Sequence, residues 1–126
     1  MEIILNHTIV NSTDKINSAR FYERVYGFEF LKVWGNFAVV KVNSTLTLDF
    51  IDKDRFSSQH YAFKVSDEDF DRIFKNIQNE DIPYGSAPTS TKNMKINHHY
   101  GGRGVYFPDP SGHILEILTA DYDIYS

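Results

Sequence analysis

The chain has 126 residues, of which 41% are hydrophobic and 15% aromatic, as in a globular domain with a real core. Its formal net charge is −4 and no basic stripe stands out, which argues against nucleic acid as a partner. Because cysteine is absent, disulfides, thiolate metal ligands and a cysteine nucleophile are excluded. Neither a signal peptide nor an apolar run of the roughly 20 residues needed for a membrane helix is visible, so we expect a cytoplasmic protein without a membrane partner.

The first half of the chain predicts the element order β-α-β-β-β. A β-rich run over residues 3–10 leads into a helix that begins near Asp14 and ends at Gly27, a C-terminal capping residue. The apolar stripe of this helix consists of Ile16, Ala19, Tyr22 and Tyr26. Three short strands, separated by Gly-Asn and Asn-Ser turns, follow at residues 29–34, 36–42 and 45–51.

The second half predicts the same order again. A strand at residues 59–65 precedes a helix that Ser66 can cap, with Asp69 three residues further on. The apolar stripe of this helix consists of Phe70, Ile73, Phe74 and Ile77. Strands are expected near residues 83–87, at 103–107 and at 113–119, with the turn Pro-Asp-Pro-Ser-Gly between the last two. A repeat of half the chain predicts one α+β domain over residues 1–126, built from two tandem βαβββ modules at about 1–53 and 59–123.

Each half carries one histidine in its first strand and one carboxylate in its last strand. These residues are His7 and Asp49 in the first half and His60 and Glu116 in the second. Glu116 stands in the aliphatic run ILEIL, where a carboxylate is costly to bury without a partner. If a pseudo-twofold relates the halves, the four side chains converge, and they suit a divalent ion such as Zn, Fe(II), Mn or Ni.

Simpler interpretations exist for each of these side chains. A strand histidine is more often a hydrogen-bonded core residue, Asp49 can lie at a strand end close to water, and Glu116 can form a salt bridge with an arginine or lysine. The repeated placement of the four residues favours the metal site over these separate explanations.

Three stretches resemble the vicinal oxygen chelate superfamily, which includes glyoxalase I, fosfomycin-resistance transferases, bleomycin-resistance proteins and extradiol dioxygenases. The stretches are residues 5–10 with 18–30, residues 60–77, and residues 101–117. The most specific feature is a Phe-x-Asp-Pro-x-Gly turn followed by a strand that bears glutamate. The resemblance implies two βαβββ modules, each a curled mixed sheet backed by a helix, around a metal and ligand cleft that is usually completed in a homodimer.

The resemblance also implies a metal site. In the metal-dependent branches the ligands are the first-strand histidine of each module and the last-strand glutamate of the second, which match His7, His60 and Glu116. Glyoxalase I has a fourth ligand, a glutamate, where this chain has the shorter Asp49, which is therefore either a ligand or a general base beside the metal. The resemblance leaves open whether the ligands come from one chain or from two.

The family members differ in activity, and the chain departs from several of them. Ile9 replaces the threonine expected in fosfomycin transferases, and residues 119–126 lack their basic side chains. The expected function is electrophilic metal catalysis on a small oxygen-bearing substrate, with glyoxalase-like isomerisation or lyase chemistry, or transfer of a low-molecular-weight thiol, favoured over dioxygenation. The alternative is a protein that sequesters a small molecule such as an antibiotic, although bleomycin-binding proteins generally lack the metal ligands.

Substrate contacts are expected from the long irregular stretch at residues 83–104 and from the strand after it. The candidates are His98, Tyr100, Arg103 and Tyr106. The alternative is a solvated loop with incidental charge. His113 is expected to point away from Glu116, because an odd offset in a strand places two side chains on opposite faces.

Overall fold

A computed structural model describes residues 1–124 of the chain, so Tyr125 and Ser126, which end the segment without basic residues, lie outside the described part. The chain divides into two compact units, Met1–Ser57 and Ser58–Ser126, which are described separately below. The two α-helices have 12 and 13 residues, and no helix in the described range is long and apolar enough to cross a membrane.

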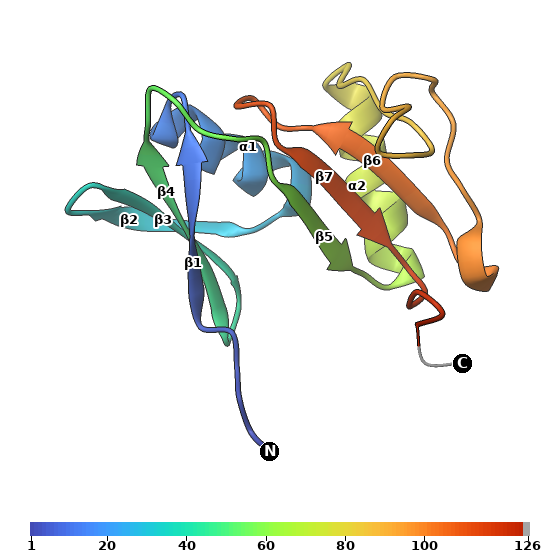
Figure 1. Ribbon diagram of the computed structural model, residues 1–126, viewed down its shortest axis with the longest axis horizontal. Coiled ribbons are helices and arrows are strands. Elements are labelled where there is room, and N and C mark those ends of the chain that lie inside the picture. The colour runs from blue at the N-terminus through green and yellow to red at the C-terminus, as the bar shows by residue number, and fades with distance from the viewer. Residues whose placement is uncertain (125–126) are drawn as a thin grey trace. The chain divides into compact units, whose positions relative to one another are not determined.

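The N-terminal unit has the element order predicted from the sequence. Its elements are β1 (His7–Ser12), α1 (Lys15–Tyr26), β2 (Glu29–Trp34), β3 (Phe37–Asn43) and β4 (Leu46–Asp52). The four strands form one sheet in the order β1-β4-β3-β2, in which β1 runs parallel to β4 and the other pairs are antiparallel (Figure 1). The last strand therefore lies beside the first strand of the same unit.

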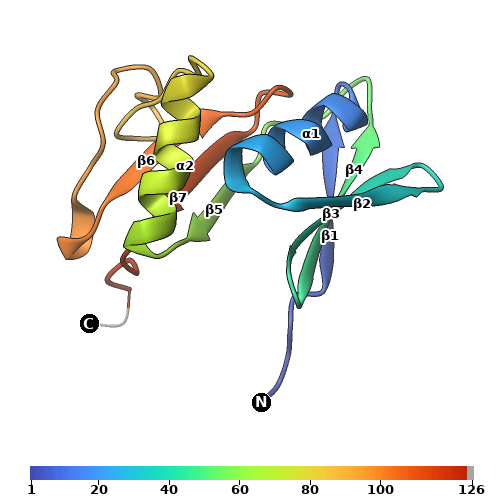
Figure 2. The same cartoon turned by 180° about the vertical axis from the view of Figure 1, so that it is seen from behind.

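Helix α1 covers one face of this sheet (Figure 2). The Asp14 side chain caps it by accepting two backbone N–H bonds, and Gly27 ends it with φ of 85°. Its buried residues are Ser18, Ala19, Phe21, Tyr22, Val25 and Tyr26. The prediction that Ile16 belongs to the buried stripe was wrong, since Ile16 is 41% exposed. Two and a half turns separate Ile16 from Val25, so the two side chains point to opposite sides of the helix.

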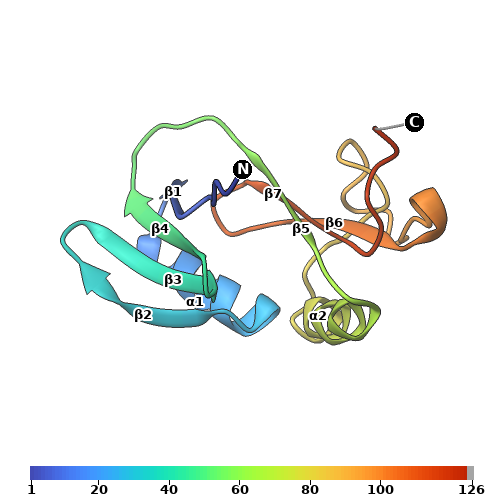
Figure 3. The same ribbon diagram turned by 90° about the horizontal axis from the view of Figure 1, so that it is seen from below.

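The C-terminal unit has one sheet and one long helix. Its elements are β5 (His60–Lys64), α2 (Asp67–Asn79), the 3₁₀ turn η1 (His99–Gly101), β6 (Gly104–Pro108) and β7 (Ile114–Leu118). The sheet has the order β5-β7-β6, and β5 runs parallel to β7. Figures 2 and 3 show α2 running along one face of this sheet. The buried core of the unit contains Phe70, Ile73, Ile77, Val105, Phe107, Leu115 and Ile117.

The strand expected near residues 83–87 is reduced to a single bridge. Gly85 pairs with Tyr106 of β6 through two backbone hydrogen bonds of 2.8 Å, and no strand forms around it. Pro83 and Pro88 flank the bridge, and proline cannot donate a backbone hydrogen bond to a ladder. Because Gly85 occupies the edge of β6 as β2 occupies the edge of β3, the place of this strand in the repeat is kept while its length is lost.

Candidate metal centre

Both units repeat the same strand register around their carboxylate. Ile9 lies opposite Asp49 across the β1–β4 pair, and Ala62 lies opposite Glu116 across the β5–β7 pair. In each case the opposing residue is the second one after the histidine that begins the strand. Alternate residues of a strand share a face, so each unit carries a histidine and a carboxylate on one face of its sheet. The core residues next to both carboxylates point to the other face, where the helix lies.

In the C-terminal unit the histidine and the carboxylate are in contact. His60 Nε2 lies 2.9 Å from Glu116 Oε1. The Glu116 side chain is 2% exposed, whereas the His60 side chain is 43% exposed. A buried carboxylate is tolerated when it is hydrogen-bonded, and here the partner is a histidine and not the arginine or lysine of the simpler interpretation.

A tyrosine pair completes the surroundings of Glu116. The Tyr122 hydroxyl donates to Glu116 Oε2 at 2.6 Å, and the Tyr106 hydroxyl lies 3.1 Å from the Tyr122 hydroxyl. Tyr106 comes from β6, where it lies opposite Glu116, and Tyr122 comes from the segment after β7. Tyr122 could not be recognised from the sequence, because a tyrosine that follows the last strand carries no signal of a contact with that strand.

The two phenols remain protonated at neutral pH. Burial raises the pKa of Tyr122, and the hydrogen bond that it donates to Glu116 raises this pKa further. Burial also raises the pKa of Tyr106, and the nearby charge of Glu116 acts in the same direction. Because the proton of Tyr122 is committed to Glu116, Tyr106 must be the donor of the hydrogen bond between the two hydroxyls.

The turn before β7 sets the direction of Glu116. Asp109 Oδ1 accepts the backbone N–H groups of Ser111 and His113, each at 2.9 Å, and closes the turn between β6 and β7. His113 is fully buried, accepts the backbone N–H of Gln59 at its Nδ1, and meets the Tyr61 ring edge-on. His113 and Glu116 therefore contact different residues, which agrees with the prediction that their odd offset places them on opposite faces of the sheet.

In the N-terminal unit, His7 and Asp49 each hydrogen-bond to a neighbour in their own segment of the chain. His7 is exposed, and its Nδ1 lies 2.7 Å from the side-chain oxygen of Asn6. A carbonyl oxygen only accepts, so Nδ1 is the donor in this contact, and the tautomer that fits it has its free lone pair on Nε2. Asp49 is half-buried and accepts a hydrogen bond from the Thr47 hydroxyl at 3.0 Å. His7 and Asp49 line one hollow of about 260 Å³, together with Asn6, Trp34, Val39 and Thr47.

The His60–Glu116 pair fits a divalent metal ion. Two ligands with bonds of about 2.1 Å and angles of about 90–109° at the metal are about 3.0–3.4 Å apart. The observed 2.9 Å between Nε2 and Oε1 needs to open by only a fraction of an ångström. In residues 1–124, no three histidine or acidic side chains gather into one group, so this pair supplies two donors of a site and not a complete set.

The substrate-contact candidates lie in different surroundings. The Tyr100 ring lies 5.6 Å from the Tyr122 ring, and the Tyr106 ring lies 5.7 Å from the His60 ring. Tyr100 also has a left-handed backbone with φ of 55°, a conformation that is sparsely populated by residues other than glycine. His98 is an exposed loop residue directly before η1. The structure thus brings two of the four candidates into the environment of Glu116.

Arg103 lies against α2 and not beside Glu116. Its guanidinium contacts Asp71 at 2.7 Å and Asp67 at 3.1 Å, and it stacks over the Phe70 ring at 4.4 Å from the ring centroid. The hydrogen bond to Asp71 raises the pKa of Arg103, so its charge is already compensated within the unit. This geometry assigns Arg103 to helix packing, and its proposed contact with an anionic substrate has no support from its position.

Replacing Arg103 by alanine is expected to lower the free energy of unfolding by about 1 kcal/mol and to leave metal affinity unchanged. The loss is small because both aspartates are exposed and the ion pairs are screened, which leaves mainly the stacking on Phe70. Urea unfolding and metal titration measure the two effects. Arg72→Ala, which removes an exposed pair with Asp69, is the matched control, with an expected loss below about 0.5 kcal/mol. A metal affinity lowered more than tenfold in Arg103→Ala would show that Arg103 contributes to the metal site.

Comparison with known proteins places this arrangement in a family. No protein-family model matches the chain. The solved structure named oxidase ChaP-H2 is 44% identical, with a TM-score of 0.93 over 98% of this chain and 98% of that one. Metallothiol transferase FosB from Bacillus licheniformis is 26% identical over 91% of this chain and 74% of that protein. A glyoxalase/dioxygenase from Nostoc punctiforme shares the fold, with 23% identity and a TM-score of 0.71 over 94% of this chain and 91% of that one.

The chain belongs to the vicinal oxygen chelate superfamily. The α+β fold predicted for this superfamily, with mixed sheets backed by helices, is confirmed. As a vicinal oxygen chelate protein, the chain keeps the internal repeat in the register of its strands, although one strand of the second module is reduced to a bridge. The positions that the resemblance marks as metal ligands, His60 and Glu116, are the ones that meet in the C-terminal unit.

Proposed function

We propose that this vicinal oxygen chelate protein is a divalent-metal-dependent enzyme that oxidises a small oxygen-bearing substrate, with His60, Glu116 and His7 as metal ligands. The observation that carries the proposal is the separation of 2.9 Å between His60 Nε2 and the buried carboxylate of Glu116. His7 is included because of the family resemblance, and the contact of its Nδ1 with Asn6 leaves Nε2 as the nitrogen available to a metal. His7 can come from the same chain as the pair or from a second copy.

The identity to solved structures favours oxidation as the type of reaction. Two structures named oxidases, ChaP-H1 and ChaP-H2, are 43% and 44% identical over 97% and 98% of this chain. The glyoxalase/dioxygenase, at 23%, supports the fold alone. The sequence by itself favoured isomerisation or thiol transfer, and these identities turn the preference toward oxidation. Thiol transfer stays the second candidate, because the metallothiol transferase matches 91% of the chain.

The residues of the chain have separate roles in this proposal. When bound, the metal ion supplies an electrophile that stabilises negative charge on a substrate oxygen, and a redox-active ion also exchanges electrons with dioxygen. Glu116 would offset part of the charge of a bound metal, and His60, which now contacts Glu116 through Nε2, would hold the metal with the same nitrogen. Asp49, which is half-buried beside His7, keeps the role proposed from the sequence as a further ligand or as a general base.

The test compares oxygen uptake with thiol chemistry in one preparation. The protein is purified without a metal-chelating tag, loaded anaerobically with Fe(II), Mn, Zn or Ni, and offered catechols in an oxygen electrode. Parallel samples receive epoxides with a small thiol, and α-ketoaldehyde–thiol adducts. We expect oxygen uptake with a hydroxylated aromatic substrate at least tenfold above that of Glu116→Gln, because the variant keeps the side-chain volume and loses the ligand charge.

Other outcomes contradict the proposal in distinguishable ways. Turnover of a thiol-containing mixture without oxygen uptake would assign the chain to the thiol transferases or glyoxalases. Stoichiometric binding of a small molecule without turnover in any mixture would indicate a sequestering protein.

A further inference from the structure

The two carboxylate oxygens of Glu116 have different partners. Oε1 lies 2.9 Å from the imidazole of His60, and Oε2 accepts the phenol proton of Tyr122 at 2.6 Å. A phenol-to-carboxylate hydrogen bond of this length is charge-assisted and belongs to the strong class. The carboxylate is therefore asymmetric before any ligand arrives, with one oxygen beside a metal-binding histidine and the other occupied by a proton donor.

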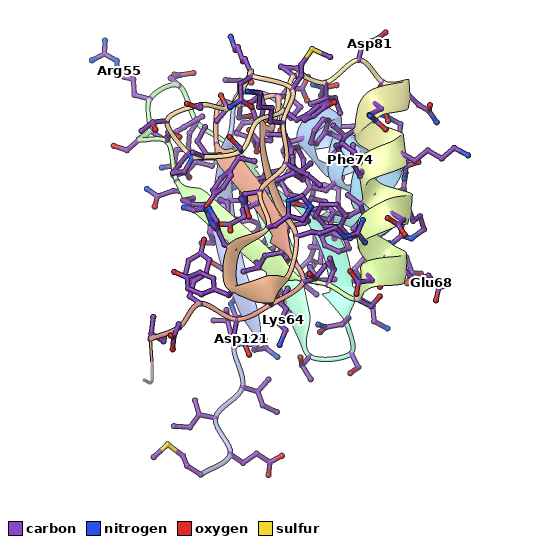
Figure 4. The ribbon with its side chains drawn as sticks, turned by 90° about the vertical axis from the view of Figure 1, so that its right-hand side faces the viewer. Arg55, Lys64, Glu68, Phe74, Asp81 and Asp121 are labelled. Carbon is purple, nitrogen blue, oxygen red and sulfur yellow. The ribbon has the colours of Figure 1, made fainter. Side chains whose placement is uncertain are left out.

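Several contacts hold Tyr122 over Glu116. The Tyr106 hydroxyl donates to the Tyr122 oxygen, and the Tyr100 ring packs against the Tyr122 ring at 5.6 Å. The residue before Tyr122 is anchored as well, because Asp121 forms an ion pair of 3.1 Å with Lys64 of β5 (Figure 4). The segment after β7 is thus attached to the open face of its own sheet by one ion pair and three aromatic side chains.

We propose that Tyr122 is a positioning residue that keeps Oε2 of Glu116 off the metal, so that Glu116 binds through Oε1 alone. This inference rests on the proposed function. A carboxylate can bind a cation through one oxygen or through both, and the second mode occupies one more coordination position. A substrate with two neighbouring oxygens needs two such positions at once. Tyr122 therefore preserves the space that this class of substrate requires.

Because Glu116 is buried, its Oε2 depends on the phenol of Tyr122 as a hydrogen-bond donor. The Glu116 side chain is 2% exposed, and Tyr122→Phe removes the hydroxyl from which Oε2 accepts while the ring beside it is kept. A buried acceptor without a partner is destabilising, and more so when it is charged. In Tyr122→Phe the metal ion becomes the partner that removes this cost, so both oxygens of Glu116 turn to it. Tyr122 itself is 41% exposed, so the variant loses the hydroxyl without leaving a cavity in the core.

The test counts the water molecules that exchange on bound Mn(II). Water-proton relaxation and pulsed electron paramagnetic resonance are measured on the wild-type protein, Tyr122→Phe, Tyr61→Phe and Glu116→Gln. We expect Tyr122→Phe to have one exchangeable water fewer than the wild type, and to bind a catechol on the Mn(II) protein at least tenfold more weakly. Tyr61→Phe removes a phenol from the opposite face of β5, where the ring packs against His113, and is expected to show the wild-type water number. A structure of the Zn-loaded variant would show both Glu116 oxygens on the metal.

The outcomes separate this inference from the proposed function. If the wild type binds Mn(II), Glu116→Gln loses it, and Tyr122→Phe keeps the wild-type water number and catechol affinity, the role of Tyr122 is refuted while the metal site stands. If Glu116→Gln binds Mn(II) as tightly as the wild type, the metal site and the role of Tyr122 fall together.

Discussion

Replacing His60 or Glu116 by alanine is expected to lower the affinity for a transition metal more than 100-fold. Loss of a residue that only supports a ligand typically costs about 10–100-fold, and loss of a ligand itself exceeds that range. Elemental analysis of protein purified without a chelating tag should show about one metal ion per chain in the wild type and almost none in either variant. Titration of the metal-free protein gives the affinities.

Two control variants make this experiment specific. His99→Ala removes an exposed histidine of the loop before β6 and should bind metal like the wild type. Glu116→Gln keeps the shape of the buried side chain, so a loss of metal in this variant cannot be attributed to a cavity. Asp49→Asn, measured in the same way, separates its two proposed roles, because a ligand contributes to affinity and a general base only to turnover. Unchanged affinity in both His60→Ala and Glu116→Ala would refute the metal site.

Replacing Gly85 by alanine is expected to reduce the free energy of unfolding by about 3–5 kcal/mol. An added Cβ would lie 1.7 Å from the carbonyl oxygen of Ser90, and this neighbour is backbone that cannot rotate away. The loop must move, which costs overpacking energy of about 1–3 kcal/mol or more and endangers the two hydrogen bonds between Gly85 and Tyr106. Urea unfolding measures the loss, and amide hydrogen exchange at Tyr106 shows whether the bridge opens.

The matched control lies in the same unit. Gly101 has φ of +79° and no atom within 4 Å of an added Cβ, so Gly101→Ala should cost only the backbone strain, about 1–2 kcal/mol. Equal losses in the two variants would mean that the loop at Ser90 adapts easily, and that the close approach at Gly85 does not constrain the edge of β6.

The elements of the fold were largely readable from local patterns. Both helices begin at a capping side chain, Asp14 or Ser66. Of the four residues predicted for the stripe of α2, three are buried and Phe74 is half-buried, because the apolar residues keep a helical period. The exposed Ile16 and the missing strand near residue 85 were not readable in this way. The exposure of Ile16 depends on which face α1 turns to its sheet. The loss of the strand depends on the loop that brings the Ser90 backbone against Gly85.

The internal repeat and the residue types of the candidate site follow from the order of residues alone. A histidine in a first strand and a carboxylate in a last strand recur at the same places because each module must put its last strand beside its first. Strand alternation then decided which side chains share a face, including the opposite directions of Glu116 and His113. These conclusions follow from covalent geometry and short-range periodicity, which the chain carries in its order of residues.

The partners of those residues depend on contacts between segments that are far apart in the sequence. Arg103 was a candidate for substrate contact until the approach of α2 placed two aspartates and a phenylalanine around it. Tyr122 meets Glu116 only because the segment after β7 folds back over that strand. Contacts between segments depend on loop paths and on competition between many side chains for the same neighbour, and neither leaves a periodic trace in the sequence.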